Sequence, residues 1–474
     1  MSEQKAANQA KLPAWAGVVI VLLVAGMIAV LGLLATSIME RRWEAQRPSF
    51  IVQPIADWEP DNAVWGQNYP REFESYARTV DDSTRTKHGG ADPRDYLDDD
   101  PRQVILFAGY GFSKDYLQAR GHAHAVTDVK ATKRIKPDFM AGTCMTCKST
   151  DVPRLMDAMG VAEFYAANFY DLKSEIQHPI GCQDCHDPKT MKLRITRPAL
   201  REGFAAMGKD IDQATHQEMR SLVCAQCHVE YYFAKEPKNY LTLPWKQGTS
   251  VEGMIEYYDA IDFADYVNPI SQVRTIKPQH PDWELFLTGV HAYAGLSCAD
   301  CHMPYKTEGG VKFTDHHVQS PLLNIENSCA VCHRWSEDKI RQRVEAIQDK
   351  VAAAMIQAED ALVKAHFDIA AGIQAGCSEN ELAAARKLVR HAQFRWDYIA
   401  ATNGVGFHSP QESMRLLGEA TNEAQEARLK VTRLLATKGI QKEPAYPDIS
   451  TREKAWAVVQ SFTGASEAKV NLIP

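Results

Sequence analysis

The sequence predicts a mainly α-helical protein with little β structure and long helices at its C-terminal end. Residues 335–439 contain three segments with helix start and stop signals. No part of the chain shows a strong alternation of apolar and polar residues, which is the pattern of half-buried strands. Of the 474 residues, 45% are hydrophobic and 24% are charged, which is typical of a folded protein and excludes a largely disordered or fibrous chain.

The three C-terminal helices are predicted from the residues at their ends. Ser378 and Glu381 form a capping box at the start of the second helix, and Pro410 suits the first position of the third. Gly376 and Gly439 are the stop signals of the first and third helices. The predicted spans are 335–376, 378–404 and 409–439.

The N-terminal segment 1–39 is predicted to be a membrane anchor. From Pro13 to Met39 there are 27 residues without a charge, which would extend ~40 Å as a helix. A bilayer core needs about 20 apolar residues, whereas the apolar part of a signal peptide usually has about 7–15. Length therefore favours an uncleaved anchor. A cleaved signal is the alternative, because Ala35 and Ser37 are small and suitably spaced.

The rest of the chain, 40–474, is predicted to form one globular body. Residues 40–334 contain the cysteine motifs described below, and residues 335–474 contain the long helices. Residues 40–110 are rich in Pro and Asp and are expected to be mostly loops. The formal net charge of −7 gives no sign of a basic stripe, so no nucleic-acid partner is expected.

Ten of the eleven cysteines form five C-x-x-C motifs. They are Cys144, Cys147, Cys182, Cys185, Cys224, Cys227, Cys298, Cys301, Cys329 and Cys332. Four motifs are followed directly by His, and C-x-x-C-H is the motif that attaches c-type haem. The two thiols bond to the haem and the adjacent His binds its iron. The predicted proximal ligands are His186, His228, His302 and His333.

Three other uses of C-x-x-C pairs are weaker interpretations. Zinc sites can use such pairs, thioredoxin-like chemistry needs one pair in a βαβ setting, and structural disulfides need no His after the pair. The eleventh cysteine, Cys377, is expected to be a free core thiol. Because c-type haem is attached on the exported side of bacterial membranes, we expect a periplasmic or extracytoplasmic body, tethered to the cytoplasmic membrane by its N-terminal segment.

In the first motif, Lys148 occupies the position of the proximal His. Lysine binds a metal only when it is deprotonated, which requires a desolvated setting. A plain electron carrier is better served by two His ligands, which leave no open position on the iron. Lys148 therefore indicates a haem whose other face binds a substrate. A degraded motif that still carries haem is the alternative.

One C-x-x-C-K motif followed by four C-x-x-C-H motifs resembles the pentahaem cytochrome c nitrite reductase family, from about Ala108 to His408. The resemblance implies a dissimilatory, ammonia-forming enzyme. It would reduce nitrite to ammonium with six electrons and eight protons at the Lys148 haem, while four bis-His haems transfer electrons. It also implies five covalent c-type haems, Ca²⁺, a homodimer built on the long C-terminal helices, and a donor that is a quinol-oxidising multihaem membrane cytochrome or a soluble multihaem protein.

The family's site residues can be matched to this sequence one by one. Its catalytic arginine follows an Arg-Gly-His stretch, here 120–122, and matches Arg134. After the third haem motif, Glu230 matches a calcium ligand and Tyr231 a residue of the substrate pocket. Segment 276–281 matches a Lys-x-Gln-His motif, in which the Lys carbonyl and the Gln side chain bind calcium and the His faces the substrate. The implied catalytic residues are Lys148, Arg134, Tyr231 and His280, and the implied calcium ligands are Glu230, Tyr231, Lys277 and Gln279.

The resemblance also implies the distal ligands of four haems. His317 would serve the second haem, His122 the third, His408 the fourth and His291 the fifth. His316 is adjacent to His317 and is an alternative on chemistry alone.

The chemistry of the matched residues suits nitrite. Arg134 can hold an oxyanion with fixed donors, and Tyr231 offers a phenolic donor. His280 can hydrogen-bond the substrate and move protons near neutral pH. Two other functions stay open. One is an electron-transfer protein whose irons are all six-coordinate, and the other is a related multihaem reductase that acts on hydroxylamine, sulfite or tetrathionate.

Overall fold

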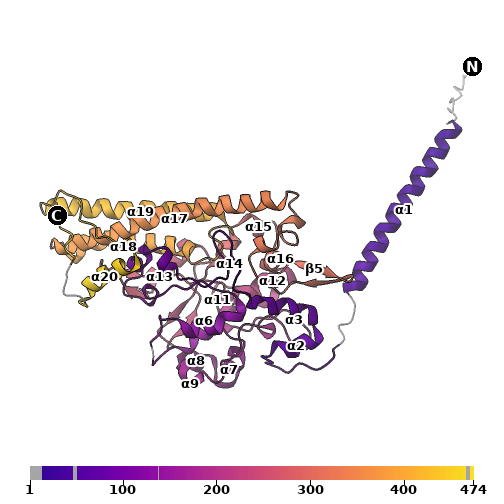
Figure 1. Ribbon diagram of the computed structural model, residues 1–474, viewed down its shortest axis with the longest axis horizontal. Helices are drawn as coiled ribbons and strands as arrows, with labels where there is room; N and C mark the ends of the chain where they lie inside the picture. The colour runs from indigo at the N-terminus through magenta and orange to yellow at the C-terminus, as the bar shows by residue number, and fades with distance from the viewer. Residues whose placement is uncertain (1–12, 46–50, 137, 466–469, 474) are drawn as a thin grey trace, which may run out of the picture. The chain divides into compact units, whose positions relative to one another are not determined.

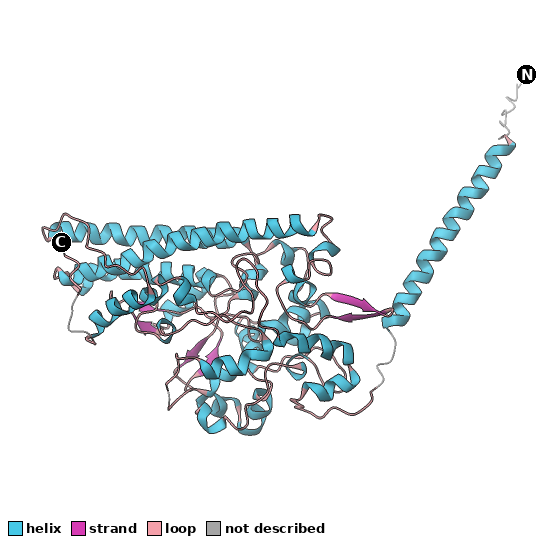
Figure 2. Cartoon of the chain, viewed as in Figure 1, coloured by secondary structure: helices cyan, strands magenta, loops and turns pink. Residues whose placement is uncertain are grey.

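Helices make up most of the described chain, which confirms the mainly α-helical prediction (Figure 2). The computed structural model describes residues 13–45, 51–136, 138–465 and 470–473. The chain falls into two units. One contains Met1–Val52, as far as it is described, together with Thr307–Phe313, and the other contains Gln53–Lys306 and Thr314–Pro474.

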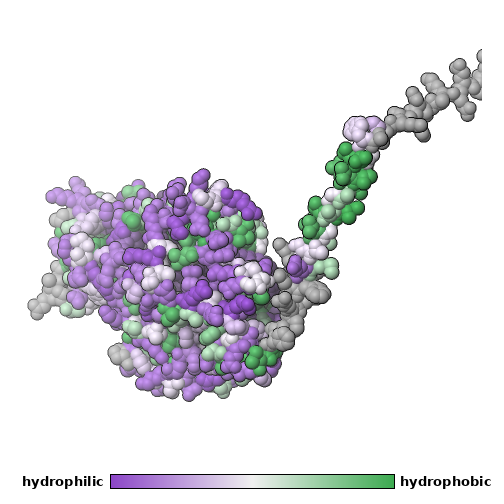
Figure 3. Space-filling model, turned by 45° about the vertical axis from the view of Figure 1, so that its right-hand side comes forward, coloured by the Kyte–Doolittle hydropathy of each residue, from purple (hydrophilic) through white to green (hydrophobic). Residues whose placement is uncertain are grey.

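The first unit contains the long apolar helix α1 (Ala14–Ala45). Its segment Trp15–Glu40 is long and apolar enough to cross a membrane, and none of it is buried. Figure 3 shows the apolar side chains of this helix in green. A membrane anchor and a signal sequence share this length and composition, so α1 is consistent with both interpretations of segment 1–39.

The second unit begins with many short helices. The α-helices are α2 (Asn62–Asn68), α3 (Pro70–Ala77), α4 (Tyr96–Asp99), α5 (Arg102–Leu106), α6 (Ala125–Ala131), α7 (Val152–Met159), α8 (Val161–Ala166), α9 (Phe169–Leu172), α10 (Cys182–Cys185), α11 (Pro198–Ala206), α12 (His216–Ala225), α13 (Val251–Ala260), α14 (Asp282–Leu287), α15 (Val290–Tyr293) and α16 (Cys298–His302). The 3₁₀ turns are η1 (Arg78–Val80), η2 (Gly111–Ser113), η3 (His122–His124), η4 (Gly142–Met145), η5 (Ile211–Gln213), η6 (Pro321–Leu323) and η7 (Cys329–Val331).

The strands of the described chain form three antiparallel pairs. They are β1 (Tyr232–Ala234) with β2 (Tyr240–Thr242), β3 (Tyr266–Val267) with β4 (Arg274–Thr275), and β5 (Tyr305–Glu308) with β6 (Val311–Thr314). Gly309 and Gly310 both have positive φ angles, 56° and 81°, and so supply the two left-handed positions that a tight hairpin turn requires. Such short pairs explain why no strand series is visible in the sequence.

The C-terminal helices α17 (Glu337–Gln374), α18 (Glu379–Ala400) and α19 (Pro410–Thr437) pack along one another (Figure 1). Their starts agree with the prediction: Ser378 and Glu381 form the expected capping box, and Pro410 is the first residue of α19. The last helix, α20 (Arg452–Thr463), lies against α5. Small buried side chains on α19 let the helices approach closely. They are Ala420, Ala424 and Ala427.

The prediction that residues 40–110 are mostly loops is wrong in part, because the described part of this segment contains α2, α3, α4 and α5. The Asp residues cap helices that are too short to show a periodic pattern. The Asp61 carboxylate accepts the backbone N–H of Ala63, and that of Asp95 accepts the N–H of Leu97. Capping of this kind compensates for the unsatisfied donors of a first turn.

Enlarging a side chain inside the bundle should destabilise the fold. Ala424 is fully buried on α19, and Ala424→Leu is expected to lower the free energy of unfolding by about 1–3 kcal/mol, because the added carbons have no room. Ala436→Leu, at an exposed position of the same helix, is the matched control. Urea unfolding followed by far-UV circular dichroism measures both. Equal midpoints for the two variants would contradict the packing described here.

Candidate haem and substrate site

Two of the C-x-x-C-H motifs lie on single helical turns with the same internal cap. In α10, the Asp184 carboxylate accepts the backbone N–H of Gly181 at 2.7 Å, and in α16 the Asp300 carboxylate accepts that of Ser297 at 2.7 Å. Each Asp also forms an ion pair with an arginine: Asp184 with Arg197 at 2.7 Å, and Asp300 with Arg220 at 2.8 Å. The middle residues of these motifs therefore fix the turn that presents the two thiols and the His. None of the ten motif cysteines is in a disulfide.

The motifs lie next to one another in the fold, although the third and fourth thiol pairs are about seventy residues apart in the sequence. The thiol of Cys147 in the first motif contacts that of Cys227 in the third. The thiol of Cys224 in the third motif contacts that of Cys298 in the fourth. Groups held on these motifs are therefore close neighbours, as electron transfer requires.

Pairs of histidine rings face each other at a spacing that fits one iron between them. A metal–imidazole bond is about 2 Å long, so two rings that share one iron have centroids about 6 Å apart. His302 and His408 have ring centroids 6.2 Å apart, and those of His291 and His333 are 6.3 Å apart. These are the pairings expected for the fourth and fifth haems.

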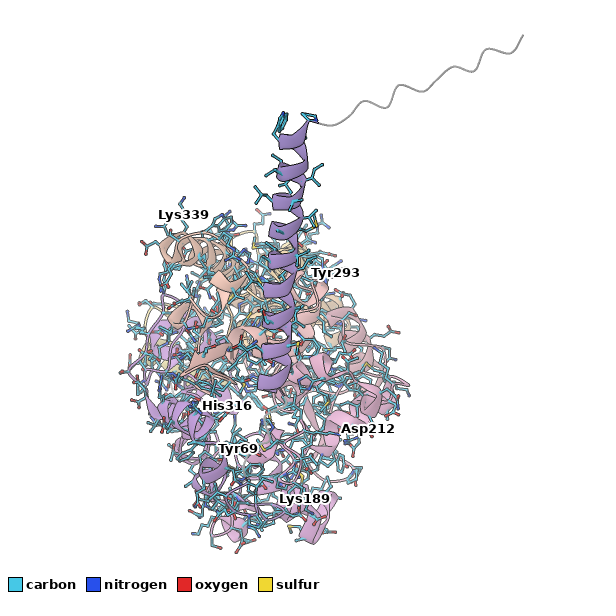
Figure 4. All side chains as sticks on the ribbon, turned by 90° about the vertical axis from the view of Figure 1, so that its right-hand side faces the viewer. Tyr69, Lys189, Asp212, Tyr293, His316 and Lys339 are labelled. Atoms are coloured by element: carbon cyan, nitrogen blue, oxygen red, sulfur yellow. The ribbon has the colours of Figure 1, made fainter. Side chains whose placement is uncertain are left out.

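The second motif differs from the expectation. The ring opposite His186 belongs to His316, with centroids 6.2 Å apart, whereas the expected ligand was His317. His316 lies on the loop after β6 (Figure 4), where its Nδ1 lies 2.7 Å from the carbonyl oxygen of Thr314. That contact leaves Nε2 for a metal.

The histidine of the third motif, His228, lies close to the first motif. His228 interacts electrostatically with His122, its expected distal partner, and with Lys148. Burial and the neighbouring His228 lower the pKa of His122 to about 4, so its imidazole is neutral and able to bind a metal.

The segment that carries Lys148 is held by a buried arginine. Arg197, which is 1% exposed, donates from Nε to the carbonyl of Thr146 at 2.7 Å and from a terminal nitrogen to the carbonyl of Ser149 at 2.9 Å. These carbonyls flank Cys147 and Lys148 on both sides. The backbone N–H of Lys148 also donates to the carbonyl of Met145 at 2.9 Å. Lys148 is therefore presented by a rigid turn.

The other expected catalytic side chains converge on the first motif. Burial lowers the pKa of His280 to about 3, so the ring is neutral, and His280 lies close to Lys148. Its Nδ1 is buried without a hydrogen-bond partner among the described residues. Tyr231 lies near Cys147 and Cys144, and burial raises its phenol pKa well above the ordinary value. Both side chains can therefore act as neutral donors.

Arg134 lies beside the same motif, within electrostatic reach of Cys144. Its guanidinium packs over the Phe112 ring, 4.4 Å from the ring centroid. The buried Asp115 carboxylate accepts the backbone N–H of Lys133 at 2.7 Å and the hydroxyl of Thr132 at 2.9 Å, and lies 3.8 Å from Arg134. This carboxylate fixes the loop that carries the arginine.

The four residues matched to calcium ligands also lie together. One carboxylate oxygen of the fully buried Glu230 accepts the backbone N–H of Gln279 at 2.6 Å, and the other accepts the Tyr258 hydroxyl at 2.9 Å. The Gln279 side-chain amide donates to the carbonyl of Lys277 at 2.8 Å. Tyr231 directly follows Glu230 in the chain. A carboxylate, an amide oxygen and two backbone carbonyls form the hard-oxygen set that Ca²⁺ prefers.

Buried acidic groups near Glu230 favour a cation at this position. Burial raises the pKa of Glu230 well above its ordinary value, that of Glu284 to about 8 and that of Asp265 to about 7. The one nearby ammonium described, that of Lys277, donates to the Asp397 carboxylate at 2.8 Å and so is already paired. A divalent cation bound by Glu230 would compensate for the charge that burial disfavours. The donors present therefore fit calcium.

Three supporting residues were not singled out from the sequence: Asp115, Arg197 and Asp282. Asp115 holds the Arg134 loop, and Arg197 holds the Lys148 turn. Asp282 lies between His228 of the third motif and His408. For Asp282, its position two residues after His280 was the one available signal. Asp115 and Arg197 contact backbone amides and carbonyls of other segments, and no sequence motif marks such contacts.

Comparisons with known proteins show which family this chain resembles. The model of the cytochrome c552 family matches residues 61–471. A cytochrome c-552 of Bacteroides fragilis is 48% identical over 94% of this chain and 92% of its own length. A cytochrome c-552 of Desulfotalea psychrophila is 40% identical over 92% of this chain and 88% of its own length.

The solved structures include a similar fold. The cytochrome c nitrite reductase of Desulfovibrio desulfuricans, described with two calcium sites in its catalytic subunit, superimposes with a TM-score of 0.76 and 32% identity, over 80% of this chain and 88% of that one. The family match covers all five cysteine motifs and the helices α17, α18 and α19. The chain belongs to the cytochrome c552 family.

Proposed function

We propose that this protein is an ammonia-forming cytochrome c nitrite reductase that converts nitrite to ammonium: NO₂⁻ + 8 H⁺ + 6 e⁻ → NH₄⁺ + 2 H₂O. The observation that carries the proposal is the convergence of Arg134, Tyr231 and His280 on the motif in which Lys148 replaces the proximal histidine. The similarity to the nitrite reductase of Desulfovibrio desulfuricans supports the same conclusion.

Five covalent c-type haems, when bound, supply the electrons and the iron at which nitrogen is reduced. Lys148 would bind one face of the first iron. The four remaining irons would each have two histidines: His186 with His316, His228 with His122, His302 with His408, and His333 with His291. Of the two adjacent candidates, His316 is proposed rather than His317, because its ring lies opposite that of His186.

The protein's own side chains prepare the substrate. Arg134, fixed by the Asp115 loop, holds the nitrite oxygens with charge-assisted hydrogen bonds. His280 is neutral at physiological pH because burial lowers its pKa to about 3, so its ring can donate an N–H hydrogen bond to nitrite without carrying a charge. Tyr231 stays protonated and donates from its phenol. Because these groups are largely enclosed, their hydrogen bonds are stronger than in water.

Calcium would be held by the Glu230 carboxylate, the carbonyls of Tyr231 and Lys277, and the side-chain oxygen of Gln279. Two of these ligands directly adjoin catalytic residues: Tyr231 supplies both a carbonyl and the phenol, and Gln279 precedes His280. The ion would therefore fix the backbone on two sides of the substrate.

We propose that the N-terminal segment sets the location of the protein and that the C-terminal helices form its homodimer. Residues 1–39 would anchor a periplasmic or extracytoplasmic body to the cytoplasmic membrane. Residues 40–334 would form the catalytic region and residues 335–474 a homodimer interface, within one globular body, 40–474. Exposed apolar side chains on α17 and α19 support such an interface, namely Ile356, Ile373, Met414 and Leu429. A quinol-oxidising multihaem membrane cytochrome or a soluble multihaem protein would supply the electrons.

Spectroscopy of the oxidised protein tests the proposal against a pure electron carrier. We expect a high-spin signal by electron paramagnetic resonance (EPR) that changes when nitrite is added, because one face of the Lys148 iron is open. A fully haem-loaded sample with low-spin signals alone and no response to nitrite would favour the electron carrier.

Removing the calcium carboxylate should weaken both metal binding and catalysis. Glu230→Gln is expected to lower calcium occupancy and to reduce turnover about tenfold or more, because a neutral amide replaces the charged ligand. Elemental analysis and nitrite turnover measure the two effects. Glu256→Gln, an exposed change on α13, is the control. Full calcium occupancy in the Glu230 variant would contradict the site.

A further inference from the structure

One carboxylate lies between His228 of the third haem motif and His408, whose ring pairs with His302 of the fourth motif. Asp282 Oδ2 is 3.7 Å from Nδ1 of His228, and Asp282 Oδ1 is 3.5 Å from Nδ1 of His408. Asp282 is 8% exposed. Nδ1 of His408 is buried without a hydrogen-bond partner among the described residues, so the Asp282 carboxylate is the anionic group that faces it.

The position of this carboxylate is fixed by its surroundings. Asp282 begins α14, and its backbone N–H donates to the carbonyl of His280 at 2.7 Å. The N–H of the following residue, Trp283, donates to the carbonyl of His228 at 3.1 Å. Asn403 donates to the carboxylate from its backbone at 3.2 Å and from its side-chain amide at 3.4 Å. Asp282 therefore cannot turn away from the two rings without disturbing three segments.

Other histidines that are expected to bind haem iron have a different kind of acceptor facing Nδ1. Nδ1 of His186 lies 2.9 Å from the carbonyl oxygen of Met191, and Nδ1 of His302 lies 3.0 Å from that of Gln319. Nδ1 of His316 also faces a carbonyl oxygen, that of Thr314. These acceptors are neutral backbone groups. His228 and His408 instead face one shared negative charge.

The acceptor at Nδ1 influences the metal bound at Nε2. A carboxylate draws the Nδ1 proton toward itself and makes the ring a stronger donor to the metal. A stronger, more anionic ligand stabilises the ferric state more than the ferrous state and so lowers the reduction potential. A neutral carbonyl has a weaker effect.

We propose that Asp282 is a positioning residue shared by the third and fourth haems, which holds His228 and His408 from one carboxylate and lowers the reduction potentials of both irons together. The inference rests on the proposed ligation by these two histidines. It gives the third and fourth haems a common electrostatic control, located two residues from His280.

The test is the redox titration of the holoenzyme carrying Asp282→Asn, which keeps the side-chain shape and removes the charge. Two of the five potentials are expected to shift upward, with a change in the EPR spectra of two low-spin haems, while the other three stay in place. Asp187→Asn is the matched control, because Asp187 adjoins His186 but its carboxylate bonds to Lys189 and Thr190. It should leave the third and fourth potentials unchanged. Five unchanged potentials in a fully loaded Asp282 variant, or an equal shift of all five, would overturn the proposal.

A second variant should shift the same two reduction potentials in the opposite direction. Asn403→Ala removes one donor to the carboxylate, which becomes a stronger acceptor, so the same two potentials should shift downward. No shift, or an upward shift, would also overturn the proposal, and this variant serves if Asp282→Asn fails to bind five haems. Because potentials are measured without nitrite, a wild-type protein that forms no ammonium would refute the proposed activity and leave the Asp282 result standing.

Discussion

Replacing His280 with asparagine is expected to lower nitrite turnover by about 10²–10⁴-fold, which is the usual contribution of a positioned proton donor. The reason is geometric and electrostatic. His280 lies close to Lys148 and is enclosed, and burial lowers its pKa to about 3, so the ring is neutral and can donate an N–H hydrogen bond to the substrate. Asparagine keeps a donor in place but cannot pass a proton on. Steady-state ammonium formation with reduced viologen measures the effect.

The control for this variant is His216→Asn, an exposed change at the start of α12, which should retain wild-type turnover. Haem content and calcium content should equal those of the wild type in both variants, because His280 is not an expected ligand of either. Turnover of His280→Asn within about threefold of the wild type would show that another group moves the protons.

Replacing Lys148 with histidine is expected to keep five haems and to lower turnover about tenfold or more, which corresponds to about 1.4 kcal/mol or more of barrier. The variant restores the C-x-x-C-H motif of the other four haems, so attachment is expected to continue. Arg197 holds the backbone on both sides of residue 148, and it should hold the new side chain under the iron as well. What changes is the ligand, from an amine to an imidazole.

Intact mass shows whether Lys148→His carries five haems, and the viologen assay gives its turnover. The natural control is His333→Lys, the reverse exchange in the fifth motif, which should alter a bis-His haem and create no second nitrite site. Wild-type turnover in Lys148→His would show that the amine ligand has no special role.

The long helices could be predicted because their signals are local. The capping box of Ser378 and Glu381 and the proline at 410 act within one turn, and the structure places α18 and α19 at these residues. The short helices α2 and α4 were missed because they have seven and four residues, too few for a periodic pattern, although Asp61 and Asp95 cap them.

The site residues also divide into those that a local sequence motif predicts and those that depend on the fold. The cysteine motifs and Lys148 could be predicted because the two thiols and the axial ligand are adjacent in the sequence. The choice between His316 and His317 depends on which way the loop after β6 turns, and this is set by contacts such as the hydrogen bond from the backbone of His316 to Ser75. Asp282 was not predicted as a partner of His408 because 126 positions separate them, and only the fold brings them within 3.5 Å.

The most direct test of the central claim is the product and electron balance of one reaction. Purified protein with five haems is given ¹⁵N-labelled nitrite and a counted amount of reduced viologen. We predict one labelled ammonium per nitrite consumed and six electrons used for each, with no accumulation of free intermediates. Nitrite consumption that ends at nitric oxide, or an absence of ammonium from a fully loaded sample, would contradict the proposed function.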